Sequence, residues 1–116
     1  MKNTQILVAA IAAACLAGTA QADTQVSSDQ GSMTWDQAMS HCRGMGMRLP
    51  TINELMWAMN HFEGSRFAAQ RGYWSSDTGG SVNSARWAST GTSPRWNGYS
   101  SNSRNARYHV VCIRTN

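Results

Sequence analysis

The chain has 116 residues, a formal net charge of +4 at pH 7 and only 14% charged residues. This length indicates one small domain, and no segment after the N-terminus approaches the ~20 apolar residues that a transmembrane helix requires. The three cysteines include no close pair, which argues against a thioredoxin-type motif or a cysteine-rich metal site.

The N-terminus has the three parts of an export signal. Lys2 supplies a positive start, residues 6–17 form an apolar run, and Ala20-Gln21-Ala22 offers a small-residue cleavage site. The sequence therefore predicts a signal peptide over residues 1–22, and a mature protein that is periplasmic, extracellular or attached to the cell surface. A competing interpretation makes Cys15 the lipid-modified first residue of a lipoprotein, although Ala12 stands where such signals usually carry leucine.

Cleavage after residue 22 leaves two cysteines, Cys42 and Cys112, together with nine arginines and six acidic residues, a net charge of +3. An exported chain with two distant cysteines favours a disulfide over a metal or redox site. On the chain-entropy model, a bond that closes so long a loop stabilises the fold by roughly 4 kcal/mol.

Residues 23–32 are polar and show no periodicity, so we interpret them as a flexible leader before a domain over residues 33–116. The domain begins with a helix, because Thr34 and Gln37 have capping-box spacing. Four residues then recur on one helical face: Trp35, Ala38, Met39 and Cys42. Gly44 and Gly46 end this helix.

A second capping box, Thr51 and Glu54, follows Pro50 and begins a second helix. Its expected apolar stripe consists of Ile52, Leu55, Met56, Met59 and Phe62.

After Gly64 the pattern changes to short aromatic or β-branched stretches separated by Gly, Ser, Asn and Thr, which is typical of an antiparallel sheet. The stretches are residues 73–75, 85–88 and 108–113. Alternation in the last stretch places Tyr108, Val110 and Cys112 on one face. Residues 98–105 are Ser- and Asn-rich and predict a long loop, anchored by Trp96 and Tyr99.

The motifs in residues 34–38, 48–55, 73–76, 85–87 and 111–114 resemble those of bacterial C-type lectin-like domains. Similar domains form the C-terminus of a Legionella collagen-like adhesin and the tips of intimin- and invasin-type adhesins. The resemblance implies an α+β fold, with two short helices packed on a small twisted antiparallel sheet. It also implies that a disulfide joins the first helix to the last strand, through Cys42 and Cys112.

Calcium-dependent sugar binding, which occurs in animal C-type lectins, requires several oxygen ligands from carboxylates and amides. In this chain Trp96-Asn97 is followed by Gly98, and no Asp or Glu follows Asp77. We therefore expect no metal, no cofactor and a calcium-independent module.

The second half of the chain is basic, with seven arginines against Asp77 from Gly64 onward. The planar guanidinium of arginine binds carboxylates, sulfates and phosphates with paired hydrogen bonds. We expect an aromatic and cationic binding surface built from Arg86, Arg95, Trp96, Asn97, Tyr99, Asn102, Arg104 and Arg107. Two alternatives to a binding role stay open. The first is that these arginines are ordinary solvated surface residues. The second is that Trp96 anchors a loop instead of serving as a stacking platform for a sugar.

Catalysis is the least supported class. His41, His61 and His109 have no carboxylate at a useful spacing, and Ser75-Ser76 lacks the glycine-flanked elbow of a serine nucleophile. Ordinary structural or surface roles are expected for the histidines, and core positions for Trp35, Trp74 and Trp87.

The expected function is that of a secreted, adhesin-like binding module for an acidic glycan or another anionic cell-surface component. The alternative is a protein-interaction accessory subunit of a surface or secretion apparatus, with an envelope or secreted protein as partner. Export argues against nucleic acid. A shallow polar cleft with arginines would favour glycans, whereas exposed apolar area around Trp57 or Trp96 would favour a protein partner.

Overall fold

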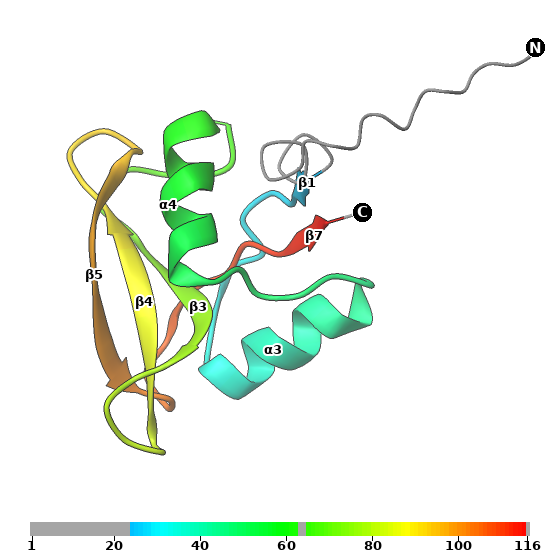
Figure 1. Cartoon of the computed structure of the whole chain (residues 1–116), viewed down its shortest axis with the longest axis vertical. Helices are drawn as coiled ribbons and strands as arrows, with labels where there is room; N and C mark the ends of the chain where they lie inside the picture. The colour runs from blue at the N-terminus through cyan, green and yellow to red at the C-terminus, as the bar shows by residue number, and fades with distance from the viewer. Residues whose placement is uncertain (1–23, 63–64, 116) are drawn as a thin grey trace, which may run out of the picture.

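The computed structural model describes residues 24–62 and 65–115, so the predicted signal peptide over residues 1–22 lies outside the described residues. Two helices, α3 (Trp35–Gly44) and α4 (Ile52–His61), precede most of the strands (Figure 1). The strands are β1 (Thr24–Val26), β2 (Ser32–Met33), β3 (Gly72–Thr78), β4 (Ser84–Thr90), β5 (Trp96–Ser103), β6 (Tyr108–His109) and β7 (Ile113–Thr115).

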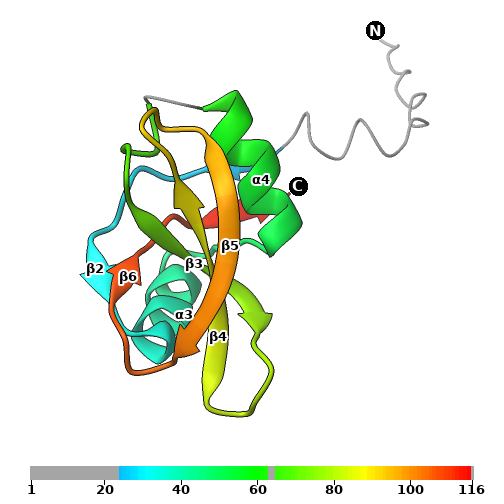
Figure 2. The ribbon, with the colours of Figure 1, turned by 90° about the vertical axis from the view of Figure 1, so that its left-hand side faces the viewer.

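The strands form a five-stranded sheet in the order β2-β6-β3-β4-β5 and a two-stranded sheet of β1 and β7. All pairs are antiparallel except β3 and β6, which are parallel. Figure 2 shows the larger sheet with β5 at its edge and α4 beside it. The chain is therefore an α+β protein with two short helices packed on a small, mainly antiparallel sheet, as the sequence predicted.

Both helices begin at the predicted capping boxes. The hydroxyl of Thr34 accepts a hydrogen bond from the backbone N–H of Gln37, and the Gln37 side chain accepts one from the Thr34 backbone; Thr51 and Glu54 do the same for α4. After α3, Gly46 takes the left-handed φ of 72° and turns the chain away from the helix. Met56 was expected in the buried stripe of α4, but it is 40% exposed.

The core has two clusters, and alternate residues of the C-terminal segment enter different ones. Val111 and Ile113 pack in a cluster with α4, whereas Val110 and Cys112 pack in a cluster with α3. The predicted alternation is therefore correct, although β6 ends at His109 and β7 begins only at Ile113.

Cys42 and Cys112 form a disulfide with their Cα atoms 5.4 Å apart, and both side chains are fully buried in the α3 cluster. The bond joins α3 to the segment that precedes β7. The tryptophans predicted for the core lie there as well: Trp35 and Trp74 are buried, and Trp87 packs against the same cluster.

The interpretation of residues 23–32 as a flexible leader differs from the structure over residues 24–32. Thr24–Val26 pairs with β7, Ser27 donates its N–H to the Cys112 carbonyl, and Gln30 donates to the Val110 carbonyl. Backbone groups make these bonds, and they are independent of side-chain polarity. A polar segment without periodicity can therefore still be an ordered part of the domain.

The prediction of a loop over residues 98–105 is wrong for most of that segment, because β5 extends to Ser103. This strand pairs with β4 from Ser84↔Ser103 to Thr90↔Trp96, with a register shift near Ser89. Most of its side chains are exposed at the edge of the sheet. An exposed edge strand has no buried face that would impose an apolar alternation, so Ser and Asn are tolerated.

Candidate functional site

An open cleft of about 430 Å3 lies where the N-terminal turn of α4 meets strands β3, β4 and β5. Its lining is mainly polar and consists of Ile52, Asn53, Asp77, Thr78, Arg86 and Tyr99. We refer to it as the Arg86 cleft.

Arg86 and Tyr99 come from neighbouring strands and meet across the sheet. Arg86 pairs with Ser101 and Ala88 pairs with Tyr99, so Arg86 and Tyr99 are diagonal neighbours on one face. The guanidinium carbon of Arg86 lies 5.5 Å from the centroid of the Tyr99 ring, a cation–π arrangement. Within the described part of the chain, this guanidinium makes no hydrogen bond or ion pair.

Asp77 has one carboxylate oxygen engaged and one available. Its Oδ2 accepts a hydrogen bond of 2.8 Å from the backbone N–H of Ile52, which satisfies one of the unpaired donors at the start of α4. Its Oδ1 has no hydrogen-bond partner among residues 24–62 and 65–115. The side chains of Asn53 and Thr78 are exposed and, within the same residues, also form no hydrogen bonds.

Of the eight predicted binding residues, only Arg86 and Tyr99 line this cleft. The Trp96 ring lies 6.3 Å from the Tyr99 ring, but it is partly buried against the α4 cluster. Arg95 and Asn97 are exposed near the register shift between β4 and β5, outside the cleft lining.

The other three predicted binding residues make contacts within the domain. Arg104 forms an ion pair of 2.5 Å with Asp36, and its guanidinium lies 4.5 Å from the Trp35 ring centroid. The Arg107 guanidinium donates to the Ser32 carbonyl at 2.7 Å. The amide of Asn102 donates to the Tyr108 hydroxyl at 2.9 Å. These contacts join β5 and the turn after it to the α3 side of the fold.

Sequence reasoning missed Asn53, Asp77 and Thr78 as cleft residues. Asn53 belongs to α4 and precedes the basic half of the chain, whereas Asp77 and Thr78 lie in β3 within that half but are not among the eight predicted binding residues. The sequence signal for the cleft is Asp77 itself, the last Asp or Glu residue in the chain.

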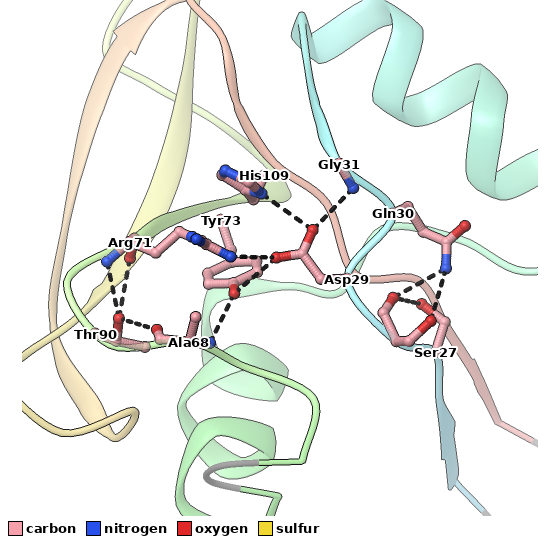
Figure 3. A network of polar contacts seen from close by, with 10 residues as sticks. Ser27, Asp29, Gln30, Gly31, Ala68, Arg71, Tyr73, Thr90 and His109 are labelled. Atoms are coloured by element: carbon pink, nitrogen blue, oxygen red, sulfur yellow. Dashed lines mark hydrogen bonds and ion pairs between the residues drawn. The ribbon is translucent and has the colours of Figure 1, made fainter.

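A second polar region is centred on Asp29, between β1 and β2 (Figure 3). Its Oδ1 accepts hydrogen bonds from the Gly31 N–H at 2.8 Å and from the His109 ring at 3.0 Å. Its Oδ2 accepts from the Tyr73 hydroxyl at 3.0 Å and from the Arg71 guanidinium at 3.2 Å. Four donors from separate segments therefore hold one carboxylate whose side chain is 24% exposed.

These contacts control the ionisation of Asp29. Burial raises the pKa of Asp29, but the hydrogen bonds from Gly31, His109 and Tyr73 outweigh it and bring the pKa below its ordinary value. For Tyr73, burial raises the pKa of the phenol, and the nearby Asp29 charge acts in the same direction. His109 thus has a structural role, with a carboxylate partner 80 positions earlier in the chain.

A cavity of about 320 Å3 adjoins this network and includes Asp29, Arg66 and Arg71 in its lining. Arg66 donates from Nε to the Val26 carbonyl and lies over the Phe62 ring, while Arg71 binds Asp29. The charged groups of this cavity therefore have partners, unlike Arg86.

Two further properties bear on function. Within the described residues, no set of three or more His, Cys, Asp or Glu side chains is arranged to hold a metal ion. In the same residues, no helix combines the length and apolar character needed to cross a membrane.

No protein-family model matches the chain, and a search of curated proteins finds no match.

Proposed function

We propose that this chain is an exported C-type lectin-like binding module that recognises an anionic or glycosylated surface without calcium. The Arg86 cleft is its binding site. One observation carries the proposal: Arg86 lines an open polar cleft, and its guanidinium has no acidic partner among the described residues. An arginine in this state can form paired hydrogen bonds to a carboxylate, sulfate or phosphate.

The arrangement of the fold supports the lectin-like part of the proposal. Two helices pack with a mainly antiparallel sheet, and the disulfide joins the first helix to the C-terminal segment. The resemblance of the sequence motifs implies two helices on an antiparallel sheet and a disulfide to the last strand, whereas Cys112 lies directly before β7. Fold and motif thus agree except in this position of Cys112, and the function rests on the cleft rather than on the fold.

The surface also favours a glycan over a protein partner. Trp57 and Trp96 are partly buried against the core, so neither forms the centre of an exposed apolar patch. The large apolar side chains that are exposed come from separate segments of the described chain: Met45, Met56, Val82 and Tyr99. Tyr99 adds an aromatic wall to a polar cleft, a combination that suits sugars.

The alternative, a protein-interaction subunit of a surface or secretion apparatus, is favoured by one observation. Strand β5 is at the edge of the five-stranded sheet, and its outer edge pairs with no other described strand. Such an edge can accept a strand from a partner. Recovery of one protein in equal amount with the domain from envelope extracts, without competition by acidic sugars, would favour this alternative.

The test of the first function is binding to a panel of uronate-containing, sialylated and sulfated oligosaccharides at two salt concentrations. We expect Arg86→Gln to weaken binding to the best ligand about tenfold, which corresponds to about 1.4 kcal/mol. Binding by the unaltered protein should weaken as salt rises. The matched control is Arg43→Gln, because Arg43 is exposed on α3 and its side chain has no partner among the described residues. Equal binding by the Arg86 and Arg43 variants would contradict the proposal.

A further inference from the structure

The Arg86 cleft contains charges of both signs. Arg86 and Asp77 are the two charged residues of its lining, so the cleft is formally neutral. No ion pair links them within the described residues, which leaves each charge able to interact with a ligand. A ligand with many negative charges would gain from Arg86 and be repelled by Asp77.

The remaining polar groups of the cleft suit hydroxyl groups. The Oδ1 atom of Asp77 accepts hydrogen bonds only, and its other oxygen is held by Ile52, which fixes the orientation of the carboxylate. Asn53 offers an amide that can donate and accept, and Thr78 offers a hydroxyl; both are exposed in the cleft and have no partner among the described residues. A sugar with adjacent hydroxyls can use all three.

Arg86 can bind one anionic group of a ligand through its guanidinium. Its guanidinium carbon lies 5.5 Å from the Tyr99 ring centroid, and this cation–π contact limits its motion. The guanidinium N–H groups make no hydrogen bond within the described residues. The fork of donors matches a carboxylate with two parallel hydrogen bonds.

We infer that the Arg86 cleft recognises a sugar unit that carries a single carboxylate beside free hydroxyls, as in a uronic acid. Arg86 binds the carboxylate, and Asp77 and Asn53 accept and donate to the hydroxyls. The inference rests on the proposed function and narrows its ligand class. Neutral sugars lose the Arg86 interaction, and polysulfated chains encounter the Asp77 charge.

Titration calorimetry on the mature protein tests this with three probes: a methyl glucuronoside, methyl glucoside and a heparin-derived oligosaccharide. The methyl glucuronoside should bind about tenfold more tightly than methyl glucoside, because a charge-assisted hydrogen bond is stronger than a neutral one. Arg86→Gln should remove this difference. Arg43→Gln should leave it unchanged.

Asp77→Asn gives opposite effects on two probes. It should weaken methyl glucuronoside binding about fivefold, because an amide oxygen is a weaker acceptor than a carboxylate. It should strengthen heparin oligosaccharide binding about threefold, because a like charge is removed. The asparagine oxygen still accepts from Ile52, and circular dichroism checks that α4 is retained. Asn53→Ala, at an exposed position, provides a second variant and should weaken both monosaccharides equally.

The outcomes separate the inference from the function on which it rests. Tighter binding of the heparin oligosaccharide that depends on Arg86 and is unaffected by Asp77→Asn overturns the inference and leaves the proposed function standing. Absence of binding by every acidic glycan overturns both. The opposite effects of Asp77→Asn, with retained helix content, support both.

Discussion

The Asp29 network and the Arg86 cleft each contain an aspartate, an arginine and a tyrosine, and they differ in how many hydrogen bonds these side chains make within the protein. In the network, Arg71 and Tyr73 both donate to Asp29, whose two oxygens accept four hydrogen bonds. In the cleft, Arg86 lies over Tyr99, and Asp77 uses one oxygen for the backbone of Ile52.

This difference in hydrogen bonding distinguishes polar groups that stabilise the fold from polar groups that can bind a ligand. A polar group that is partly buried and fully bonded stabilises the fold, and its removal leaves its partners without bonds. A polar group that faces water without a protein partner adds little to stability and remains free for a ligand. Residue type alone therefore does not identify a site; the hydrogen-bond partners do.

The largest expected effect is a loss of stability on removal of the disulfide between α3 and the C-terminal segment. Replacement of both Cys42 and Cys112 by serine should lower the free energy of unfolding by roughly 4 kcal/mol, because the bond closes most of the domain. Urea unfolding measures the change. The folded fraction should keep its glycan affinity, since the cleft is lined by other elements. Unchanged stability would show that the bond constrains little of the unfolded chain.

Asp29→Ala is the next largest change. It removes the acceptor of four donors and should lower the free energy of unfolding by about 3 kcal/mol. The control is Asp36→Ala, whose carboxylate is 72% exposed and pairs with Arg104 at the surface. It should cost less than about 1 kcal/mol. Equal losses in the two variants would mean that the number of bonds to Asp29 has no energetic consequence.

A smaller effect is expected on the pH dependence of stability. The folded-state pKa of Asp29 lies below its unfolded value, so its contribution is present above the unfolded pKa and is lost as pH falls through the folded pKa. Glu54 acts in the same direction, because its hydrogen bond with Arg48 lowers the pKa of that carboxyl. Stability should therefore fall below about pH 4. Urea midpoints at several pH values measure this, and Asp29→Asn should flatten the curve; an unchanged slope would contradict the role of Asp29.

The helices could be predicted from the sequence because their signals are local. The Thr34 and Thr51 capping boxes each lie within four residues, and both helices begin there. The alternation of Val110 to Ile113 is similarly local, and it correctly separates the two core clusters.

Strand β5 and the segment before β2 could not be predicted in this way. β5 is held by its pairing with β4, and residues 24–30 are held by backbone bonds to the C-terminal segment. The partners are distant in sequence, and the polar composition resembles that of loops. The same reason applies to the cleft, where Asn53, Asp77 and Arg86 come together only after α4 has packed beside the sheet.

The most direct test of the contrast is the affinity for methyl glucuronoside of Arg86→Gln and Asp29→Ala, measured in parallel under conditions where both variants are folded. We predict that Arg86→Gln loses about tenfold in affinity, and that Asp29→Ala binds like the unaltered protein despite its lower stability. Loss of affinity in Asp29→Ala with full binding by Arg86→Gln would contradict the assignment of recognition to the cleft and of stability to the network.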